Sequence, residues 1–553
     1  MRCKRNTWKL ALPCLAALVL AGQNGPAGTS DQDHDGIPDQ WETNGINLKY
    51  PDGSTHFLDL KGHKASPGHK DIIVWVDWMG NETLNEGGKH TVHNHKPMDS
   101  AIAIVKNAFA NAKQIDDNPD GTKGINLIVL VSPNPVPHKD MLGSGDLDDG
   151  TVWNDFNPIR DGHFPAQLRG IAHYCLFAHD ITSDGRSGLS YDFGAYDFIV
   201  SLGQWQNHSG NESEQAGTFM HELGHNLTLH HGGADDLNYK PNYLSIMNYF
   251  FQTDGLATPT GQDTFNYSVF AFPDLNELSL NEKEPITKDS TWANWGSAYF
   301  CPSDKKRSRT IASIYGTVVD WNCDGQFTTG VQGDINGDDP PSGGGVDLLK
   351  SQADWKQIHY IFPPPVPGRG PSGKHSTAEL SVAGANRTPL PPAGGLTALA
   401  QGTKVRLSWN RVPSSRVRGY EIARIAPNRP AVVFATTDLS YVDTLPEPVP
   451  ELRYEVHTLF VPHGARELLK MTGTKLEDGL DLLTVGKLNV PVAVRMAERT
   501  AVNQLQRNFT SAIELVRARG GMTPAMLTNF ANDVEDLKML LASQPARIAV
   551  KFQ

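Results

Sequence analysis

The stretch FMHELGHNLTLHHGG, residues 219–233, constrains this chain more than any other feature. On an α-helix, His221 and His225 would lie about 6 Å apart along the axis and differ by about 40° in direction, so both imidazoles can reach one ion. Glu222 points to another side of the same turn, where its carboxylate can contact a water bound to that ion, as a general base must. The spacing therefore predicts a metal site with a carboxylate beside it.

A third ligand is needed, because catalytic zinc sites hold three protein ligands and keep one position for water. An unbroken helix would carry His231 about 15 Å from His221, so the chain must turn before it. The pattern of His221, Glu222, His225 and His231 resembles the metzincin zinc peptidases, whose motif is H-E-x-x-H-x-x-G-x-x-H. That resemblance implies that His231 is the third zinc ligand.

The metzincin resemblance extends downstream to YLSIMNYFF. Met247 occupies the position of the Met-turn, which packs beneath the zinc-ligating histidines, and Tyr249 matches a tyrosine that stabilises the oxyanion. Thr228 departs from the motif, because metzincins place Gly there. A β-branched residue in that backbone conformation is expected to cost on the order of 1 kcal/mol or more.

The resemblance, which runs from about residue 71 to residue 249, implies an endopeptidase with Zn²⁺ as cofactor and a protein or peptide as substrate. Glu222 would take a proton from the attacking water and pass it to the leaving amine. Substrate would lie along an edge strand, which we expect between Gly188 and Val200. The span between the signal peptide and the first strand holds no cysteine, so we expect no propeptide of the cysteine-switch kind.

The chain of 553 residues is long enough for several domains. Buried-strand patterns at KDIIVWVDWM, GINLIVLVSP, GIAHYCLFAHDI and YDFIVSLG alternate with a helical pattern at MDSAIAIVKNAFANAKQ, which predicts an α/β domain with a twisted mixed sheet. Asn211 or Ser213 is expected to cap the helix that carries the histidines.

A Pro/Gly-rich stretch separates this domain from an alternating pattern that indicates a β-sandwich. The order of Trp409, Tyr420, Tyr441 and Tyr454 resembles a fibronectin type III domain, which is a candidate for binding a surface or matrix ligand. The expected organisation is a signal peptide at 1–22, an N-terminal segment at 29–66, a metzincin-like domain at 67–361, a linker at 362–393, a fibronectin type III-like domain at 394–460 and a C-terminal helical region at 461–553.

The N-terminus and the charge indicate where the protein works. Basic residues precede the apolar run LALPCLAALVLAG, which is the length of a secretory signal and too short to span a bilayer. We therefore expect an exported, extracellular protein with no membrane span. The net charge of −12 argues against nucleic acid as a partner. Of the cysteines outside the signal, Cys301 and Cys323 are the expected disulfide, and Cys175 is expected to be a buried strand thiol.

DQDHDGIPDQWE matches the twelve-residue calcium-loop pattern. Because the loop starts near the expected mature N-terminus, it resembles the isolated Asp-rich loops of thrombospondin type 3 repeats more than an EF-hand. Ca²⁺ is therefore the second expected cofactor. The expected ligands are Asp31, Asp33, Asp35, Asp39 and Glu42.

An alternative function comes from a different class of protein. The chain could be an extracellular adhesion or binding protein whose zinc site is structural and has no catalytic role. A serine hydrolase is disfavoured because no G-x-S-x-G elbow lies near a strand-to-helix turn.

Overall fold

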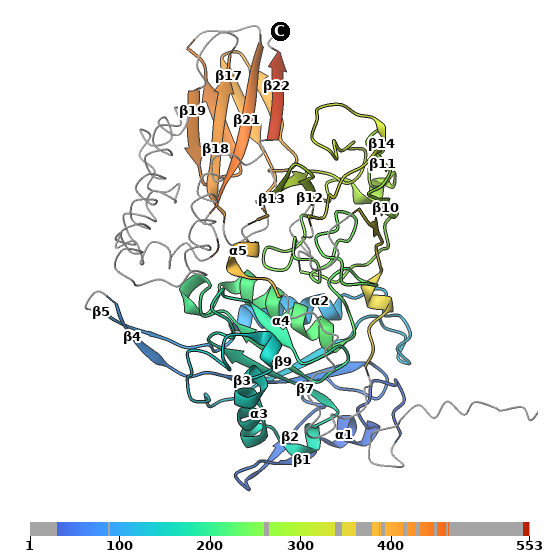
Figure 1. Cartoon of the computed structure of the whole chain (residues 1–553), viewed down its shortest axis with the longest axis vertical. Coiled ribbons are helices and arrows are strands. Elements are labelled where there is room, and N and C mark those ends of the chain that lie inside the picture. The colour runs from blue at the N-terminus through green and yellow to red at the C-terminus, as the bar shows by residue number, and fades with distance from the viewer. Residues whose placement is uncertain are drawn as a thin grey trace, which may run out of the picture.

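The computed structural model describes residues 30–86, 89–258, 265–337, 346–360, 379–385, 387–388, 393–412, 417–426, 432–446, 451–460, 463 and 546–551 (Figure 1). The expected signal peptide lies outside these residues. Within the described part of the chain, no helix is long and apolar enough to cross a membrane.

A five-stranded mixed sheet forms the centre of the N-terminal half. Neighbouring strands run parallel, except that β8 (Gly188–Ser190), at one edge of the sheet, is antiparallel to its neighbour β9 (Asp197–Ser201). Every residue of β3, β7 and β9 is buried, because other elements cover both faces of the sheet. In spatial order the strands are β6 (Asn126–Val131), β3 (Asp71–Trp78), β7 (Ala172–Ala178), β9 (Asp197–Ser201) and β8 (Gly188–Ser190).

Alternate residues of β3 face two different cores. Val74 and Val76 join the core that contains α2 and α4, whereas Ile73 and Trp75 join the core that contains α3. The predicted α/β arrangement is therefore present, with helices on both faces of the sheet (Figure 1). These helices are α2 (Asp99–Ala110), α3 (Val152–His163) and α4 (Glu212–Asn226).

Short elements surround the sheet, and several of them pair as antiparallel hairpins or bridges. They are α1 (Asp39–Asn44), β1 (Ile46–Lys49), β2 (Thr55–Leu58), β4 (Glu82–Glu86), β5 (Lys89–His93), β10 (Leu275–Asn276), β11 (Leu280–Asn281), β12 (Ser297–Cys301), β13 (Asp304–Ile311), β14 (Thr329–Val331), β15 (Leu348–Leu349), η1 (Leu147–Asp149), η2 (Ala166–Leu168), η3 (Gln206–His208), η4 (Ser290–Trp292) and η5 (Asp354–Lys356).

The cysteines pair as the sequence predicted. Cys301 and Cys323 form a disulfide with Cα atoms 5.9 Å apart. Cys301 lies at the end of strand β12. Cys175 is a buried free thiol in β7.

A β-sandwich follows, as the alternating pattern predicted. Trp409 packs edge-on against Tyr420 at 5.3 Å between ring centroids, and both side chains lie in its core. The buried Asp443 accepts a hydrogen bond from Tyr454 at 2.7 Å and pairs with Arg424 at 2.8 Å. One sheet holds β16 (Thr397–Gln401), β17 (Lys404–Ser408) and β20 (Ser440–Thr444); the other holds β19 (Val432–Thr436), β18 (Val417–Ile425), β21 (Glu451–Phe460) and β22 (Ala546–Lys551).

The predicted C-terminal boundary of the β-sandwich at residue 460 is wrong, because strand β22 also belongs to this domain. The sequence placed residues 461–553 in a helical region, but Ala546–Lys551 pairs antiparallel with β21. The segment RIAVK alternates in the strand manner: Val550 is buried in the sandwich core and Arg547 pairs with Glu455. The rest of the expected helical region, except residue 463, lies outside the described residues.

Candidate metal centre

Helix α4 begins at a reciprocal cap. The side chain of Asn211 accepts from the backbone N–H of Glu214, and the Glu214 carboxylate accepts from the backbone N–H of Asn211. Asn211, one of the two expected caps, is therefore the N-cap. All of α4 after its first residue is buried. Two glycines permit this burial, since a Cβ on Gly217 would lie 1.6 Å from the Gln252 carbonyl oxygen and one on Gly224 would lie 2.4 Å from the Met247 sulfur.

The three predicted zinc ligands converge. Nε2 of His225 lies 3.0 Å from Nε2 of His221 and 3.1 Å from Nε2 of His231. In two of these rings the other nitrogen points to a carbonyl oxygen: His221 Nδ1 lies 2.9 Å from Ile246 O and His225 Nδ1 lies 2.8 Å from Leu229 O. A carbonyl only accepts, so these Nδ1 atoms carry the proton and the Nε2 lone pairs face the shared space.

This arrangement fits a zinc-type ion. A ring nitrogen has either one lone pair or one hydrogen, so His225 Nε2 cannot make good hydrogen bonds to both neighbours. A cation between the three lone pairs satisfies all of them, and imidazole nitrogens are ligands that zinc prefers.

The turn that returns His231 to the helix is made at Thr228. Its φ is +76°, in the left-handed region, and the N–H of Leu229 donates to Gly224 O at 2.9 Å. Thr228 thus adopts the conformation expected of the glycine that it replaces. His230 lies outside the group, and its Nδ1 contacts Asp236 Oδ1 at 2.9 Å.

Met247 lies against helix α4, and Tyr249 lies beside His231. Met247 is fully buried beneath the helix, against Gly224. The Tyr249 hydroxyl lies 3.0 Å from His231 Nε2. Burial, and after it the charge of Glu379, raises the pKa of Tyr249 well above its usual range, so the hydroxyl keeps its proton and can donate it to a hydrogen bond.

Glu222 lies against the edge strand of the sheet. A Cβ on Gly188, in β8, would lie 2.6 Å from Glu222 Oε1, so only glycine leaves room for the carboxylate. Burial, followed by the nearby charge of Glu379, raises the pKa of Glu222 well above its ordinary value. A carboxylate with this environment binds a proton more readily than an exposed glutamate does.

Glu379 is a fourth donor that the sequence did not reveal. Its Oε2 lies 3.6 Å from Nε2 of His221 and of His231, and its Oε1 lies 4.0 Å from Nε2 of His225. Tyr249 donates to Oε2 at 3.3 Å. Glu379 falls in the predicted linker 362–393 as an isolated acidic residue, and no spacing connects it to the motif. The linker prediction is corrected for residues 379–385, which include the short helix α5 (Val382–Ala385).

The segment around Glu379 pairs with the chain that leads into β8. The N–H of Ser187 donates to Leu380 O at 2.9 Å, and Ser381 forms an antiparallel bridge with Arg186. Residues 379–381 therefore run alongside the edge where the sequence placed the substrate. That expectation covered residues 188–200; β8 is the edge, whereas β9 lies inside the sheet.

The acidic N-terminal loop forms two overlapping groups. Asp31, Asp33 and Asp35 each bring one oxygen within 4.8 Å of the others, and Asp35 does the same with Glu42 and Asp71. The sequence missed Asp71, the first residue of β3, because it lies outside the loop pattern. Asp39, an expected ligand, instead accepts from the N–H of Gln32 at 2.9 Å and belongs to neither group.

Two carboxylates in this loop lack donors. Neither oxygen of Asp33 or of Glu42 has a hydrogen-bond partner among the described residues, although both side chains are buried. Burial raises the pKa of Asp33 to about 6 and that of Glu42 to about 9. Buried carboxylates without donors are costly unless a cation compensates them.

Comparisons with known proteins give partial similarities. No protein-family model matches the chain. Over 65 residues the chain is 43% identical to snake venom metalloproteinase TM-1 of Protobothrops mucrosquamatus, a match that covers 11% of this chain and 32% of that protein. The chain thus spans about a third of the length of this curated relative.

Two solved structures illustrate the structural similarities. A Fn3-like protein from Clostridium thermocellum is 24% identical, with a TM-score of 0.12, over 13% of this chain and 81% of its own. Catalytically inactive OgpA from Akkermansia muciniphila, in complex with an O-glycopeptide substrate, is 10% identical, with a TM-score of 0.18, over 72% of this chain and 91% of its own.

Replacing Thr228 by Gly should stabilise the protein. Glycine adopts φ near +76° without the strain of a β-branched side chain, and this gain exceeds the entropy that glycine loses on folding. We expect the free energy of unfolding to rise by about 0.5–1 kcal/mol in urea titrations of the zinc-loaded protein. Thr228→Ala is the matched control, because it removes the hydroxyl but keeps most of the strain. A less stable glycine variant would show that the turn is not strained.

Proposed function

We propose that the chain is an exported zinc-dependent endopeptidase of metzincin type that hydrolyses extracellular proteins or peptides. The observation that carries the proposal is the convergence of three histidine Nε2 atoms, in which that of His225 lies 3.0 Å from that of His221 and 3.1 Å from that of His231. Glu222 lies on the same helix as His221 and His225. The partial similarity to a snake venom metalloproteinase supports the same class of reaction.

The residues of the site would divide the reaction between them. His221, His225 and His231 would hold Zn²⁺, which lowers the pKa of a bound water towards neutrality when it is present. Glu222 accepts a proton from the attacking water and returns it to the amide nitrogen as the C–N bond breaks. The protonated Tyr249 hydroxyl donates a hydrogen bond to the oxygen of the carbonyl under attack.

Strand β8 is the proposed substrate edge. It is the outermost strand of the sheet, and its Gly188 lies against Glu222. A peptide added antiparallel to this edge would place a carbonyl beside the histidines. Residues 379–381 already run antiparallel there, through the bond from Ser187 to Leu380 and the Arg186–Ser381 bridge.

Glu379 gives the proposed enzyme a latent form. Its carboxylate lies near all three ligand nitrogens, in the position that water must take. The chain therefore supplies its own fourth ligand and its own strand on the substrate edge. Activity would require residues 379–381 to move away from the three histidines.

Glu379 also supports a second candidate function. Three histidines and one carboxylate fill all four positions of a tetrahedral zinc site, and structural zinc sites are closed in this way. If Glu379 is a permanent ligand, the protein is an extracellular binding protein whose sandwich contacts a surface or matrix ligand.

For the N-terminal loop we propose Ca²⁺, held by Asp31, Asp33, Asp35, Glu42 and Asp71. The buried, donor-free carboxylates of Asp33 and Glu42 support this assignment. Asp71 begins β3, so the ion would tie the N-terminal loop to the central sheet.

The substitution Glu379→Ala separates the two candidate functions. We expect kcat/KM for casein cleavage to rise at least about tenfold, because removing the carboxylate frees the fourth position. Glu222→Gln in the same background should lower cleavage about 10²–10⁴-fold with zinc retained, since only the proton acceptor is lost. Zinc content is measured on the same samples by mass spectrometry.

The exposed Glu284 provides the matched control, and Glu284→Ala should change neither cleavage nor zinc content. Loss of zinc from Glu379→Ala without any gain of cleavage would establish the closed, structural site. Cleavage that survives Glu222→Gln would contradict the assigned base.

Calcium should stabilise the protein through the N-terminal loop. Adding 1 mM Ca²⁺ to metal-stripped, zinc-reloaded protein is expected to raise Tm by roughly 1–5 °C, given the affinity typical of extracellular calcium modules. Asp33→Asn should abolish this shift in differential scanning calorimetry. Asp39→Asn should keep it, because the Asp39 carboxylate faces the Gln32 N–H. Loss of the Tm shift in both variants would instead favour the ligand set expected from the sequence pattern, which includes Asp39.

A further inference from the structure

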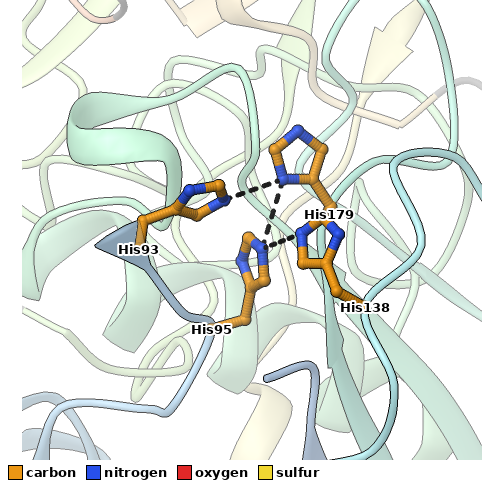
Figure 2. Close-up of side chains that lie close together, drawn as sticks. All are labelled: His93, His95, His138 and His179. Carbon is orange, nitrogen blue, oxygen red and sulfur yellow. Dashed lines mark hydrogen bonds between the residues drawn. The ribbon is translucent and has the colours of Figure 1, made fainter. Parts of the chain in front are cut away.

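Four histidines outside the α4 centre gather at the carboxyl edge of the parallel strands (Figure 2). His93 ends β5 and His95 follows it closely, His138 lies in the loop after β6, and His179 directly follows β7. The rings come from the end of the hairpin, the loop after β6 and the end of β7, and they point toward one another. The carboxyl edge of a parallel sheet is where open α/β sheets bind ligands.

The backbone holds these segments in place. The N–H of His95 donates to Met79 O at 3.0 Å, just beyond the end of β3. Val136 pairs in parallel with Met79, which fixes the loop that carries His138. Gly203 lies so close to His179 that a Cβ would be 2.6 Å from the ring carbon Cδ2, and its N–H donates to His179 O.

Four ring nitrogens converge. His95 Nε2 lies 3.2 Å from His138 Nε2 and 3.2 Å from His179 Nδ1, and His179 Nδ1 lies 3.3 Å from His93 Nε2. In a tetrahedron with zinc–nitrogen bonds of 2.0–2.1 Å, the nitrogens are about 3.3–3.4 Å apart. The observed spacings thus match the edges of such a tetrahedron to within about 0.2 Å.

Hydrogen bonds between the rings are a poorer explanation of this geometry. His95 Nε2 and His179 Nδ1 each contact two other ring nitrogens, but each has only one in-plane lone pair or one hydrogen. A cation at the centre satisfies all four nitrogens at once.

Carboxylates lie behind two of the rings. His138 Nδ1 is 3.4 Å from Asp140 Oδ1, and His179 Nε2 is 3.6 Å from Asp180 Oδ2. Metal-ligating histidines commonly have a carboxylate at the nitrogen that faces away from the ion. His208 packs against this group, 5.2 Å from the His93 ring, but its Nδ1 is 3.2 Å from Gly203 O and it is not one of the four.

We propose that His93, His95, His138 and His179 form a second metal centre that binds a divalent transition-metal ion, with Zn²⁺ as the expected occupant. All four positions of a tetrahedral ion are filled by protein ligands, so the centre is structural and not catalytic. It ties the end of the β4–β5 hairpin to the ends of the strands of the central sheet. The proposal is independent of the peptidase function, because it shares no residue with the α4 centre.

Metal counting on the purified full-length mature chain tests this proposal. After loading with Zn²⁺ and removal of weakly bound ion over a mild chelating resin, we expect about two zinc ions per wild-type chain, one from each centre. His138→Ala, chosen because His138 lies in a loop, and His95→Gln should each bind about one. The exposed His63 is the control, and His63→Ala should still bind two.

A second measurement does not depend on variants of the new centre. The double variant His221→Ala/His225→Ala leaves the four histidines intact and should retain about one zinc. Its X-ray absorption spectrum should show four imidazole nitrogens at about 2.0–2.1 Å and no oxygen ligand. A single zinc in the wild-type chain that the His138 and His95 variants keep would overturn the proposal, as would an oxygen-containing shell.

Discussion

The structure depends on one constraint: polar side chains are buried with their lone pairs facing one another. Helix α4 is buried along almost its whole length and still carries two histidines and a glutamate toward its C-terminal end. Lone pairs that face other lone pairs in a dry interior are unfavourable unless a cation lies between them. The helix can therefore form the centre of the domain only with the surroundings that the chain builds for it: the carbonyl acceptors of Ile246 and Leu229, the turn at Thr228 and the donor at Tyr249.

The mixed sheet positions both histidine groups, by different means. Its antiparallel edge, β8, lies against Glu222 and defines one side of the α4 centre. Its parallel strands end together, and the loops after β6 and β7 bring His138 and His179 to the same place as the histidines that follow the hairpin. After β9 the chain passes Gly203, which packs on His179, and reaches Asn211, which caps α4. The short segment 203–211 thus connects the backbone beside the second group to the start of the helix that carries the first.

Sequence reasoning found what local spacing encodes. The positions of His221 and His225, the Asn211 cap, the strands and the sandwich all follow from periodicity or from short motifs, and the disulfide from the few cysteines available. It missed Glu379, Asp71 and the four histidines, because these residues meet only through strand order and loop closure over long sequence separations. The one local hint was the pair His93 and His95, whose H-x-H spacing occurs at the end of a hairpin. The last strand, β22, was missed for a related reason: its short alternating segment pairs with β21, which precedes it by almost ninety residues.

Charge balance explains why the α4 centre favours an occupant in its fourth position. A divalent cation with the carboxylates of Glu222 and Glu379 ionised makes the buried group neutral, and a buried charge is tolerated best when it is paired. Withdrawal of Glu379 would leave one uncompensated positive charge beside three neutral imidazoles. That charge attracts a group that develops negative charge, and a peptide carbonyl oxygen develops it under attack by water. The same electrostatics that would hold Glu379 beside the three histidines would therefore favour the transition state of peptide hydrolysis once that residue leaves.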